Sequence, residues 1–384
     1  MPIEICKKEN CTGCFACMNI CPKNAITAGE DEYAKTIPLI DKDKCIECGL
    51  CVKVCPANQQ VELSYPKKCY AAWGKDESER KDCSSGGVAS ILSKAVINEK
   101  GIVYGAAFNH DLKLTHMGAE SESEIQKFKG SKYVQSYIGF SFRQIKEQLK
   151  TGRMVLFVGT PCQVAGLKSY LGKEYENLLM IDIVCHGTPP MKYLKEYMET
   201  VDPKKRATNI TFRGKKDYCF TLYNENKVFY SMKSSCDVYF YAFLKGLIHR
   251  DNCYECQWAK AERCSDITIG DFWGLEKESL KEPYTGKVSV VLINTLLGEK
   301  FWEKYKKFFD YEERTVREAV AGNAQLKRPS ICHSDRERFL SVYKREGFVK
   351  AVKTPQICRE IRKGKVRSTT LYKNVRKVKK KIFS

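Results

Sequence analysis

Cysteine spacing is the feature of this sequence that points most directly to chemistry. Residues 11–22 read CTGCFACMNICP and residues 45–56 read CIECGLCVKVCP, so one Cys-x2-Cys-x2-Cys-x3-Cys-Pro pattern occurs twice, 34 residues apart. Three thiolates on a short loop can cover one face of a 4Fe–4S cluster, while the fourth cysteine of the run ligates the other cluster. The repeat therefore predicts two 4Fe–4S clusters near the start of the chain.

The same spacing assigns the ligands of each cluster. We expect the fourth cysteine of each run to begin a helix that points away from its own loop. Each run then supplies its fourth cysteine to the cluster that the other run holds. The first cluster is then held by Cys11, Cys14, Cys17 and Cys55, and the second by Cys45, Cys48, Cys51 and Cys21. Cys6 lies outside the pattern and is expected in the first strand, without a role.

Other uses of these cysteines fit the pattern less well. A zinc knuckle needs four ligands and no repeated x2 spacing, and disulfide bonds would need an oxidising compartment. The region of about residues 1–60 resembles a bacterial two-cluster ferredoxin. That resemblance implies electron transfer and names neither donor nor acceptor.

Four further cysteines stand in settings that suit a ligand site. Cys162 and Cys185 follow the apolar runs RMVLFVG and LLMIDIV, and Cys253 and Cys256 form a Cys-x2-Cys pair. Because α/β sheets bind ligands at the carboxyl ends of their strands, these thiolates could meet and hold a third cluster. Spacing alone leaves a zinc site and a nucleophilic cysteine as alternatives, and Cys264 as a rival fourth ligand.

The segments that must position these cysteines alternate between strand-like and helix-like patterns. Apolar β-rich runs occupy 101–108, 153–159 and 178–187, and helix-like stretches occupy 86–100, 140–150 and 163–171. This alternation predicts parallel strands in an α/β layer. Further on, 219–231 predicts an antiparallel hairpin with its turn at 224–226, and 266–274 and 287–295 predict short strands. From residue 298 the chain is mostly helical and charged.

Composition and charge exclude several classes of protein. The 384 residues are 43% apolar and 29% charged, as in a soluble globular protein, and 20 cysteines over this length do not fit a small secreted disulfide scaffold. No apolar run approaches the ~18 residues of a membrane span, and the first residues lack the pattern of a secretory signal. We therefore expect a cytoplasmic protein.

Half of the net charge of +20 lies at the end of the chain. Residues 359–384 carry eleven basic residues and one acidic residue, a net of +10. Such a segment could associate with an anionic membrane surface or an acidic partner, and the alternative is a solvated terminal helix. Specific nucleic-acid binding is not expected, because only Tyr372 and Phe383 could stack on bases there.

A series of motifs in the body resembles one known family. In chain order they are SSGGV (84–88), VYGAAF (103–108), GSKYVQS (130–136), GTPCQVAGLK (159–168), DIVCHGTP (182–189), CYEC (253–256) and SDITIGDFWG (265–274). They resemble the coenzyme F420 hydrogenase/dehydrogenase beta-subunit family over about residues 65–345. With the ferredoxin-like start, the chain resembles the longer, fused type in that family.

The resemblance implies an iron–sulfur flavoprotein. It implies FAD beside a 4Fe–4S cluster held by Cys162, Cys185, Cys253 and Cys256, with coenzyme F420 as a possible substrate. The implied FAD contacts are the loop residues Ser85, Gly86 and Gly87, the second-loop residues Gly130, Ser131, Lys132 and Tyr133, and the residues before the cluster ligand, Thr160 and Pro161. Lys132 would neutralise pyrophosphate and Tyr133 would stack on a ring. The chain has no Gly-x-Gly-x-x-Gly motif and no P-loop, so a nucleotide must be held in another way.

These observations give one expected architecture and one expected function. The sequence predicts an α+β chain: a two-cluster ferredoxin domain (1–60), an α/β flavoprotein body with a mixed sheet (65–190 and 191–345) and a basic helical tail (346–384). The expected activity is an oxidoreductase that passes electrons between a hydride carrier, FAD and 4Fe–4S clusters, to a ferredoxin or another redox protein. The alternative is a non-catalytic electron-transfer subunit of a larger dehydrogenase.

Overall fold

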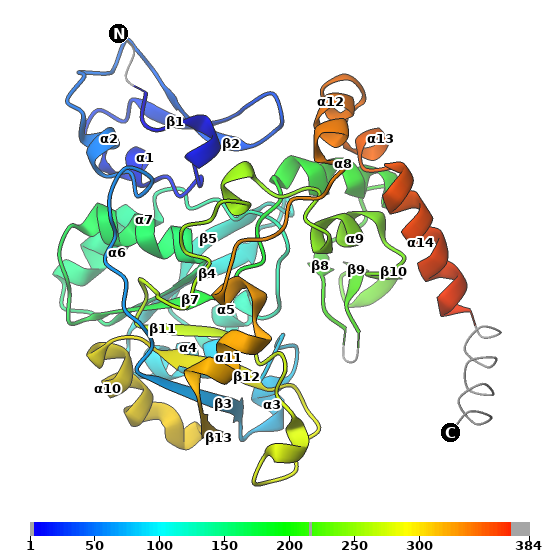
Figure 1. Cartoon of the computed structure of the whole chain (residues 1–384). Helices are drawn as coiled ribbons and strands as arrows, with labels where there is room; N and C mark the ends of the chain where they lie inside the picture. Colours follow the sequence, from blue (N-terminus) through cyan, green and yellow to red (C-terminus); the bar gives the residue numbers. More distant parts are fainter. Residues whose placement is uncertain (1–3, 215–216, 370–384) are drawn as a thin grey trace, which may run out of the picture.

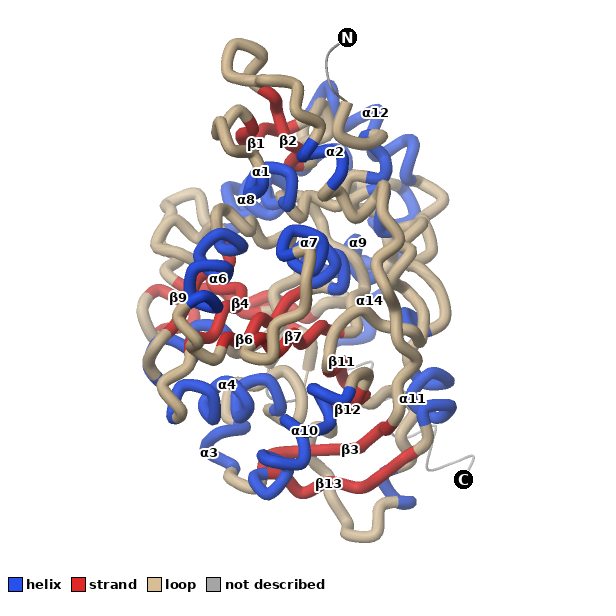
Figure 2. The backbone as a smooth tube through the Cα atoms, turned by 90° about the vertical axis from the view of Figure 1, so that its left-hand side faces the viewer, coloured by secondary structure: helices blue, strands red, loops and turns tan. Residues whose placement is uncertain are grey.

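An eight-stranded mixed sheet forms the centre of the computed structural model, which describes residues 4–214 and 217–369 (Figures 1 and 2). Strands β4, β6, β7 and β11 pair in parallel, and the strands outside them pair antiparallel. The predicted α/β body with a mixed sheet is therefore confirmed. The order across the sheet is β13 (Phe309–Arg314), β3 (Lys68–Gly74), β12 (Ser289–Ile293), β11 (Ile267–Asp271), β7 (Leu178–Ile183), β6 (Val155–Gly159), β4 (Ile102–Phe108) and β5 (Leu114–Ala119).

Strands β3, β5 and β13 lie outside the runs that the sequence predicted. The region beyond residue 298 is mostly helical as expected, and β13 is the exception. It lies at the edge of the sheet and pairs with β3 alone, and its side chains are mostly exposed or half-buried. An edge strand with the sequence FDYEER has a weak apolar pattern, so the sequence does not distinguish it from the charged helices around it.

The central strands are covered on both faces. Val155 and Phe157 of β6 lie in one apolar cluster with α6 (Ser141–Lys150) and α7 (Pro161–Leu171). Leu156 lies in another with α4 (Val88–Asn98) and α10 (Leu296–Tyr305). Because alternate residues of a strand point to opposite faces, burial of both faces explains why the sequence is almost entirely apolar over 154–159 and 178–184, with Asp182 as the one charged residue.

A second lobe packs beside the sheet and contains the predicted hairpin (Figure 1). Strands β9 (Cys219–Asn224) and β10 (Lys227–Lys233) pair antiparallel and turn at residues 225–226, and β8 (Asn209–Thr211) pairs with β9. An aromatic core joins this small sheet to α8 (Met191–Val201), α9 (Val238–Leu244), α12 (Arg336–Glu346) and α13 (Phe348–Ala351). The remaining short helices are α3 (Glu77–Arg80), α5 (Glu122–Ile125), α11 (Val316–Gly322), η1 (Lys8–Asn10), η2 (Gln126–Phe128), η3 (Asp251–Cys253), η4 (Lys277–Ser279), η5 (Lys306–Phe308) and η6 (Ala324–Leu326).

The N-terminal domain consists of the hairpin of β1 (Ile26–Glu30) and β2 (Thr36–Ile40) and two short helices, α1 (Ala16–Ile20) and α2 (Leu50–Lys53). Each helix contains the third cysteine of its run and ends before the fourth, since Cys21 follows α1 and Cys55 follows α2. The expectation that the fourth cysteine begins a helix is wrong. The helical turn comes earlier and separates the fourth cysteine from the loop that holds the first three.

This domain packs directly on α7 of the body (Figure 1). A methyl group added at Gly166 of α7 would lie 2.9 Å from both Cβ and Sγ of Cys14. Phe15, Ala16 and Met18 belong to the same buried cluster as Phe142 of α6 and Val164 of α7. The domain and the body therefore share one apolar core.

Helix α14 (Pro355–Ser368) forms the described part of the basic tail. It packs on α9, and Ile357 at its start is fully buried. This part is therefore held on the second lobe, and most of the predicted tail interaction falls on residues 370–384, which lie outside the described residues. Within residues 4–214 and 217–369, no helix has the length and apolar character that a bilayer span requires.

Candidate functional site

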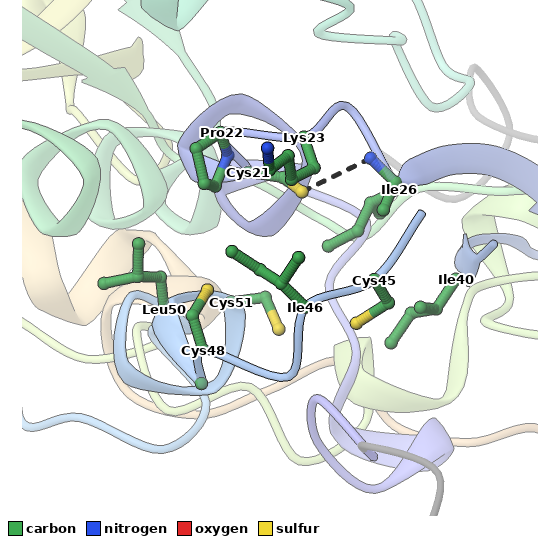
Figure 3. Close-up of a pocket in the computed structure, with 12 residues that line it drawn as sticks. Cys21, Pro22, Lys23, Ile26, Ile40, Cys45, Ile46, Cys48, Leu50 and Cys51 are labelled. Atoms are coloured by element: carbon green, nitrogen blue, oxygen red, sulfur yellow. Dashed lines mark hydrogen bonds between the residues drawn. The ribbon is translucent and has the colours of Figure 1, made fainter. Parts of the chain in front are cut away.

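The four cysteines predicted for the second cluster line one small cavity in the N-terminal domain (Figure 3). Cys21 follows α1, whereas Cys45, Cys48 and Cys51 come from the loop before α2 and its first turn. The Cys21 sulfur accepts a hydrogen bond of 3.3 Å from the amide of Ala25. Because Cys48 is exposed, this set of thiols lies next to the protein surface.

The four cysteines predicted for the first cluster also come together, on the side facing the body. Burial raises the pKa of Cys14 to about 12, and negative charge on Cys55 and Cys11 acts on it in the same direction. Burial raises the pKa of Cys17 well above its usual value, and Cys14, Cys11 and Cys55 again surround it. Cys14, Cys17 and Cys55 are all buried, so this set is more enclosed than the other.

Cys6 is closer to this set than the sequence suggested. It lies in a bend rather than a strand, and its thiol hydrogen-bonds the side chains of Cys11 and Cys55. The bond from Cys6 lowers the pKa of Cys11 to about 6. The expectation that Cys6 lies in the first strand is wrong, and its lack of a role stays a prediction.

The body cysteines form a third set. Cys162 lies in the first turn of α7, Cys185 follows β7, and Cys253 and Cys256 lie on the loop around η3. Burial raises the pKa of Cys162 well above its usual value and that of Cys185 to about 12, and both thiols lie close enough to Cys253 and Cys256 for charge on those residues to act on them. Four thiols from three separate segments therefore meet at one place.

Cys264, the rival fourth ligand, lies near this set, in the apolar cluster against which Cys162 and Cys256 pack. It is buried, and its sulfur lies 3.6 Å from the carbonyl oxygen of Pro161. Because the carbonyl oxygen gives the Cys264 thiol a protein partner, we treat Cys264 as a packing residue, and its place outside the ligand set stays a prediction.

Polar groups around the body thiols suit thiolate ligands. The amide of Gly187 donates to the Cys185 sulfur at 3.4 Å, and the Thr160 hydroxyl lies 3.1 Å from the Cys162 sulfur. The described residues contain no group of three or more His, Cys, Asp or Glu side chains placed to hold a single metal ion. Four thiols line one cavity in the set of Cys21, Cys45, Cys48 and Cys51. This donor chemistry matches a 4Fe–4S cluster, whose ligands surround an inorganic core instead of one ion.

A cavity of about 630 Å³ opens against the body thiols. Its wall includes Cys162 and Cys185 together with the carboxyl ends of β6, β7 and β11, the place where α/β sheets bind ligands. The predicted cofactor residues that line it are Ser85, Gly87, Gly130, Ser131, Lys132, Tyr133 and Thr160. The structure therefore brings three separate sequence motifs to one cavity.

Comparison with known proteins bears on both parts of the chain. Residues 152–318 match the family model for the C terminus of the coenzyme F420 hydrogenase/dehydrogenase beta subunit, and residues 10–59 match the 4Fe-4S dicluster domain. The chain thus contains a C-terminal beta-subunit domain of the F420 hydrogenase/dehydrogenase type and, before it, a 4Fe-4S dicluster domain, which is the fusion that the sequence motifs predicted. It is thus an iron–sulfur electron-transfer protein of an oxidoreductase family.

Two individual proteins illustrate the similarity. An uncharacterized protein of Methanocaldococcus jannaschii is 26% identical over 373 aligned residues, covering 85% of this chain and 96% of that protein. A chain of the F420-reducing NiFe hydrogenase complex from Methanosarcina barkeri is 19% identical with a TM-score of 0.46, covering 75% of this chain and 91% of that one.

The beginning of α4 lies on the wall of the same cavity. Gly87 precedes the helix with φ 87°, and no side chain caps the helix there. Val88, Ala89 and Ser90, which form its first turn, all line the cavity. The amide groups of a first helical turn have no partner within the helix, so they are available to an anionic ligand such as a pyrophosphate.

Two of the predicted cofactor residues lie behind the cavity wall. Gly86 packs on β3, where an added methyl group would lie 2.3 Å from the carbonyl oxygen of Ala72, and its amide donates to the Ser289 hydroxyl at 2.9 Å. Pro161 is the first residue of α7. Neither lines the cavity, so the structure gives both residues positions that support the loops beside it.

Lys132 and Tyr133 line the cavity but already have protein partners. The Lys132 ammonium donates to the carbonyl oxygens of Phe128 at 2.7 Å and Lys129 at 2.8 Å, and burial lowers its pKa to about 7. The Tyr133 ring stacks on Phe243 with centroids 4.6 Å apart. Their predicted contacts, with pyrophosphate and with a cofactor ring, stay predictions.

A polar and aromatic group on the same wall was not predicted from the sequence. Arg213 donates to Asp271 and to the carbonyl of Ser84, both at 2.7 Å, and its guanidinium lies 4.1 Å from the centre of the Tyr218 ring. Trp273 stacks on Tyr218 and is 51% exposed. Asp271 and Trp273 lie within the quoted motif SDITIGDFWG, so a signal was present, but it gave no role to either residue.

Proposed function

We propose that this chain is an FAD-dependent iron–sulfur oxidoreductase that exchanges electrons between a hydride carrier and a redox protein. The hydride carrier is coenzyme F420 or a similar soluble compound. The observation that supports this proposal most strongly is that two of the four body cysteines line one large cavity. A cofactor in that cavity would lie directly beside a cluster on Cys162, Cys185, Cys253 and Cys256.

FAD supplies the chemistry that such an arrangement needs, because a flavin accepts two electrons as hydride and releases them one at a time. The chain offers it a cavity of about 630 Å³ and the uncapped start of α4 for its pyrophosphate. Thr160 and Cys162 belong to one tight turn, so the cavity wall leads directly to a cluster ligand. These features support the fit of FAD.

Trp273 and Tyr218 mark where the hydride carrier would approach. Both line the cavity, and the exposed face of Trp273 offers a surface on which a planar ring can stack. Arg213 and Asp271 hold Tyr218 in place through the ring contact and a hydroxyl bond of 3.3 Å. We assign this side of the cavity to the substrate.

The N-terminal domain would carry electrons from the body to the surface. Its enclosed set, Cys11, Cys14, Cys17 and Cys55, faces α7, whose first turn contains Cys162. Its other set, Cys21, Cys45, Cys48 and Cys51, ends at the exposed Cys48. Ile46 is 56% exposed beside it, so an apolar contact is available to a redox protein partner.

Cofactor analysis of anaerobically purified protein tests this function. We expect one FAD and about twelve iron atoms per chain, four for each of three clusters. Replacing Cys253 and Cys256 together with Ser should remove about four iron atoms, whereas Cys264→Ser, the matched control, should remove none. Twelve iron atoms without FAD would contradict the flavoenzyme and support a non-catalytic electron-transfer subunit. About eight iron atoms in the unchanged protein would contradict the body cluster.

A further inference from the structure

Arg250 is the most deeply buried charged side chain between the N-terminal domain and the body. It is 1% exposed and lies just before η3, the turn that ends at Cys253. Its guanidinium donates to the carbonyl oxygen of Cys11 at 2.9 Å and to that of Thr36 at 3.0 Å, both in the N-terminal domain. It also donates to the side-chain oxygen of Gln135 at 2.9 Å.

The backbone of Arg250 is tied to the body thiols. Its amide donates to the carbonyl of Thr188 at 3.1 Å, and its carbonyl accepts from the amide of Cys253 at 3.0 Å. The side chain therefore reaches a ligand residue of the first N-terminal set while the backbone fixes a ligand residue of the body set.

Within the described part of the chain, no carboxylate forms an ion pair with Arg250, and the oxygens that accept its hydrogen bonds are neutral. The neighbouring buried Arg336 is different, because it pairs with Asp251 at 3.0 Å. A buried charge without a counter-charge is costly, so the protein is expected to place negative charge near it. Each four-thiolate cluster site carries such charge, and Arg250 contacts one residue of each of two sites.

We propose that Arg250 is a positioning residue that joins the body cluster site to the first N-terminal cluster site and whose charge is balanced by these two thiolate sets. This rests on the ligand sets of the proposed function. A positive charge held beside a cluster favours the form with one more electron. Arg250 therefore raises the reduction potentials of both neighbouring clusters and holds the two sites in register for electron transfer.

An anaerobic redox titration followed by EPR tests this in the full chain. Arg250→Gln should lower the reduced-to-oxidised ratio of two clusters by roughly tenfold at a fixed potential, which is about 59 mV for a one-electron couple. The cluster at Cys48 should change little. Arg250→Lys keeps the positive charge, so the reduction potentials of both clusters should stay close to those of the unchanged protein. The same variant should weaken the contacts to Cys11 and Thr36.

A second variant does not remove the arginine and so avoids a possible loss of folding. Gln135→Glu places a carboxylate 2.9 Å from the guanidinium and should lower the same two potentials with full iron content. Arg336→Gln is the matched control, since it removes a buried arginine that already has a carboxylate partner. Arg336→Gln should lower the stability of the protein but change the reduction potentials of the two clusters less than Arg250→Gln does.

The outcomes separate the role of Arg250 from the proposed function. Unchanged potentials in both Arg250→Gln and Gln135→Glu, with full iron content, would overturn the role of Arg250 alone. An equal shift in Arg336→Gln would also overturn it, because the effect would then be a general consequence of disturbing this region. A missing body cluster in the unchanged protein would instead overturn the ligand sets of the proposed function.

Discussion

Gly166 on α7 gives a direct test of how the N-terminal domain joins the body. A methyl group at this position would lie 2.9 Å from Cβ and Sγ of Cys14, a ligand residue of the first predicted cluster. This approach is shorter than ordinary van der Waals contact. Since α7 also contains Cys162 in its first turn, a change at Gly166 acts at the junction of two predicted cluster sites.

The expected magnitude is a balance of two effects. Alanine stabilises a helix interior by about 1 kcal/mol relative to glycine. Overpacking of a close contact costs about 1–3 kcal/mol. Gly166→Ala should therefore lower the stability of the domain junction by about 0–2 kcal/mol, and Gly166→Leu, with three more carbon atoms in the same place, should lower it further.

The assay follows the first cluster under anaerobic conditions. We would measure the rate at which a chelator removes iron from the full chain, together with thermal unfolding, for both Gly166 variants. Ser169→Ala on the same helix is the control, because Ser169 is only half-buried. We expect faster iron loss in the order wild type, Gly166→Ala, Gly166→Leu. Equal rates in all proteins would refute the direct packing of Cys14 on α7.

Three further predictions concern FAD, pH and the tail. Gly87→Ala should reduce bound FAD at near-normal iron content, because a backbone φ of 87° is strained for alanine. Gly86→Ala should instead reduce the yield of soluble protein, because the added methyl group meets the backbone of β3. Equal FAD content in Gly87→Ala and the unchanged protein would contradict this prediction. Burial raises the pKa of Asp237 from 3.8 to about 6, so ionisation of its carboxyl lowers the free energy of unfolding. This loss is absent well below pH 3.8, grows as the pH rises and is nearly complete above pH 6. Asp237→Asn should therefore raise the free energy of unfolding by up to about 3 kcal/mol above pH 6 and by less at pH 5, and a pH-independent difference would contradict this. Ending the chain after Thr369 removes six basic residues and keeps α14. The content of FAD and iron should be unchanged, whereas binding to anionic vesicles at low salt should be lost. Equal binding by the shortened and the unchanged protein would leave the tail without a membrane role.

The parts of the fold that sequence predicted well are those with strong local signals. Strands β4 and β6 are apolar throughout, and β7 is apolar apart from the buried Asp182, because both faces of the sheet are covered. Helices α4 and α6 lie within the predicted stretches, and α7 begins two residues before its predicted start at 163. The cysteine spacing likewise predicted the sets that the structure brings together, including the exchange of Cys21 and Cys55. Its physical basis is local, because a loop of fixed length determines where three thiols can lie.

The features that sequence missed depend on contacts between distant segments. Strands β5 and β13 lie at the edges of the sheet, where exposed faces dilute the apolar pattern. Arg250 gains its role only because it meets Cys11, which is 239 positions away. Gly86 and Gly87 are adjacent and identical in type, yet one packs on β3 and the other lines the cavity. No local pattern distinguishes such cases.

The order of electron carriers is the central claim, and one rapid-mixing experiment tests it most directly. The unchanged protein and the Cys253→Ser/Cys256→Ser variant would be mixed anaerobically with a reduced hydride carrier, with flavin absorbance and frozen-sample EPR recorded over time. The account predicts that the flavin is reduced in both proteins, whereas the N-terminal clusters are reduced quickly only in the unchanged one. Equally fast reduction of those clusters in the variant would contradict the placement of the body cluster between the flavin and the N-terminal domain.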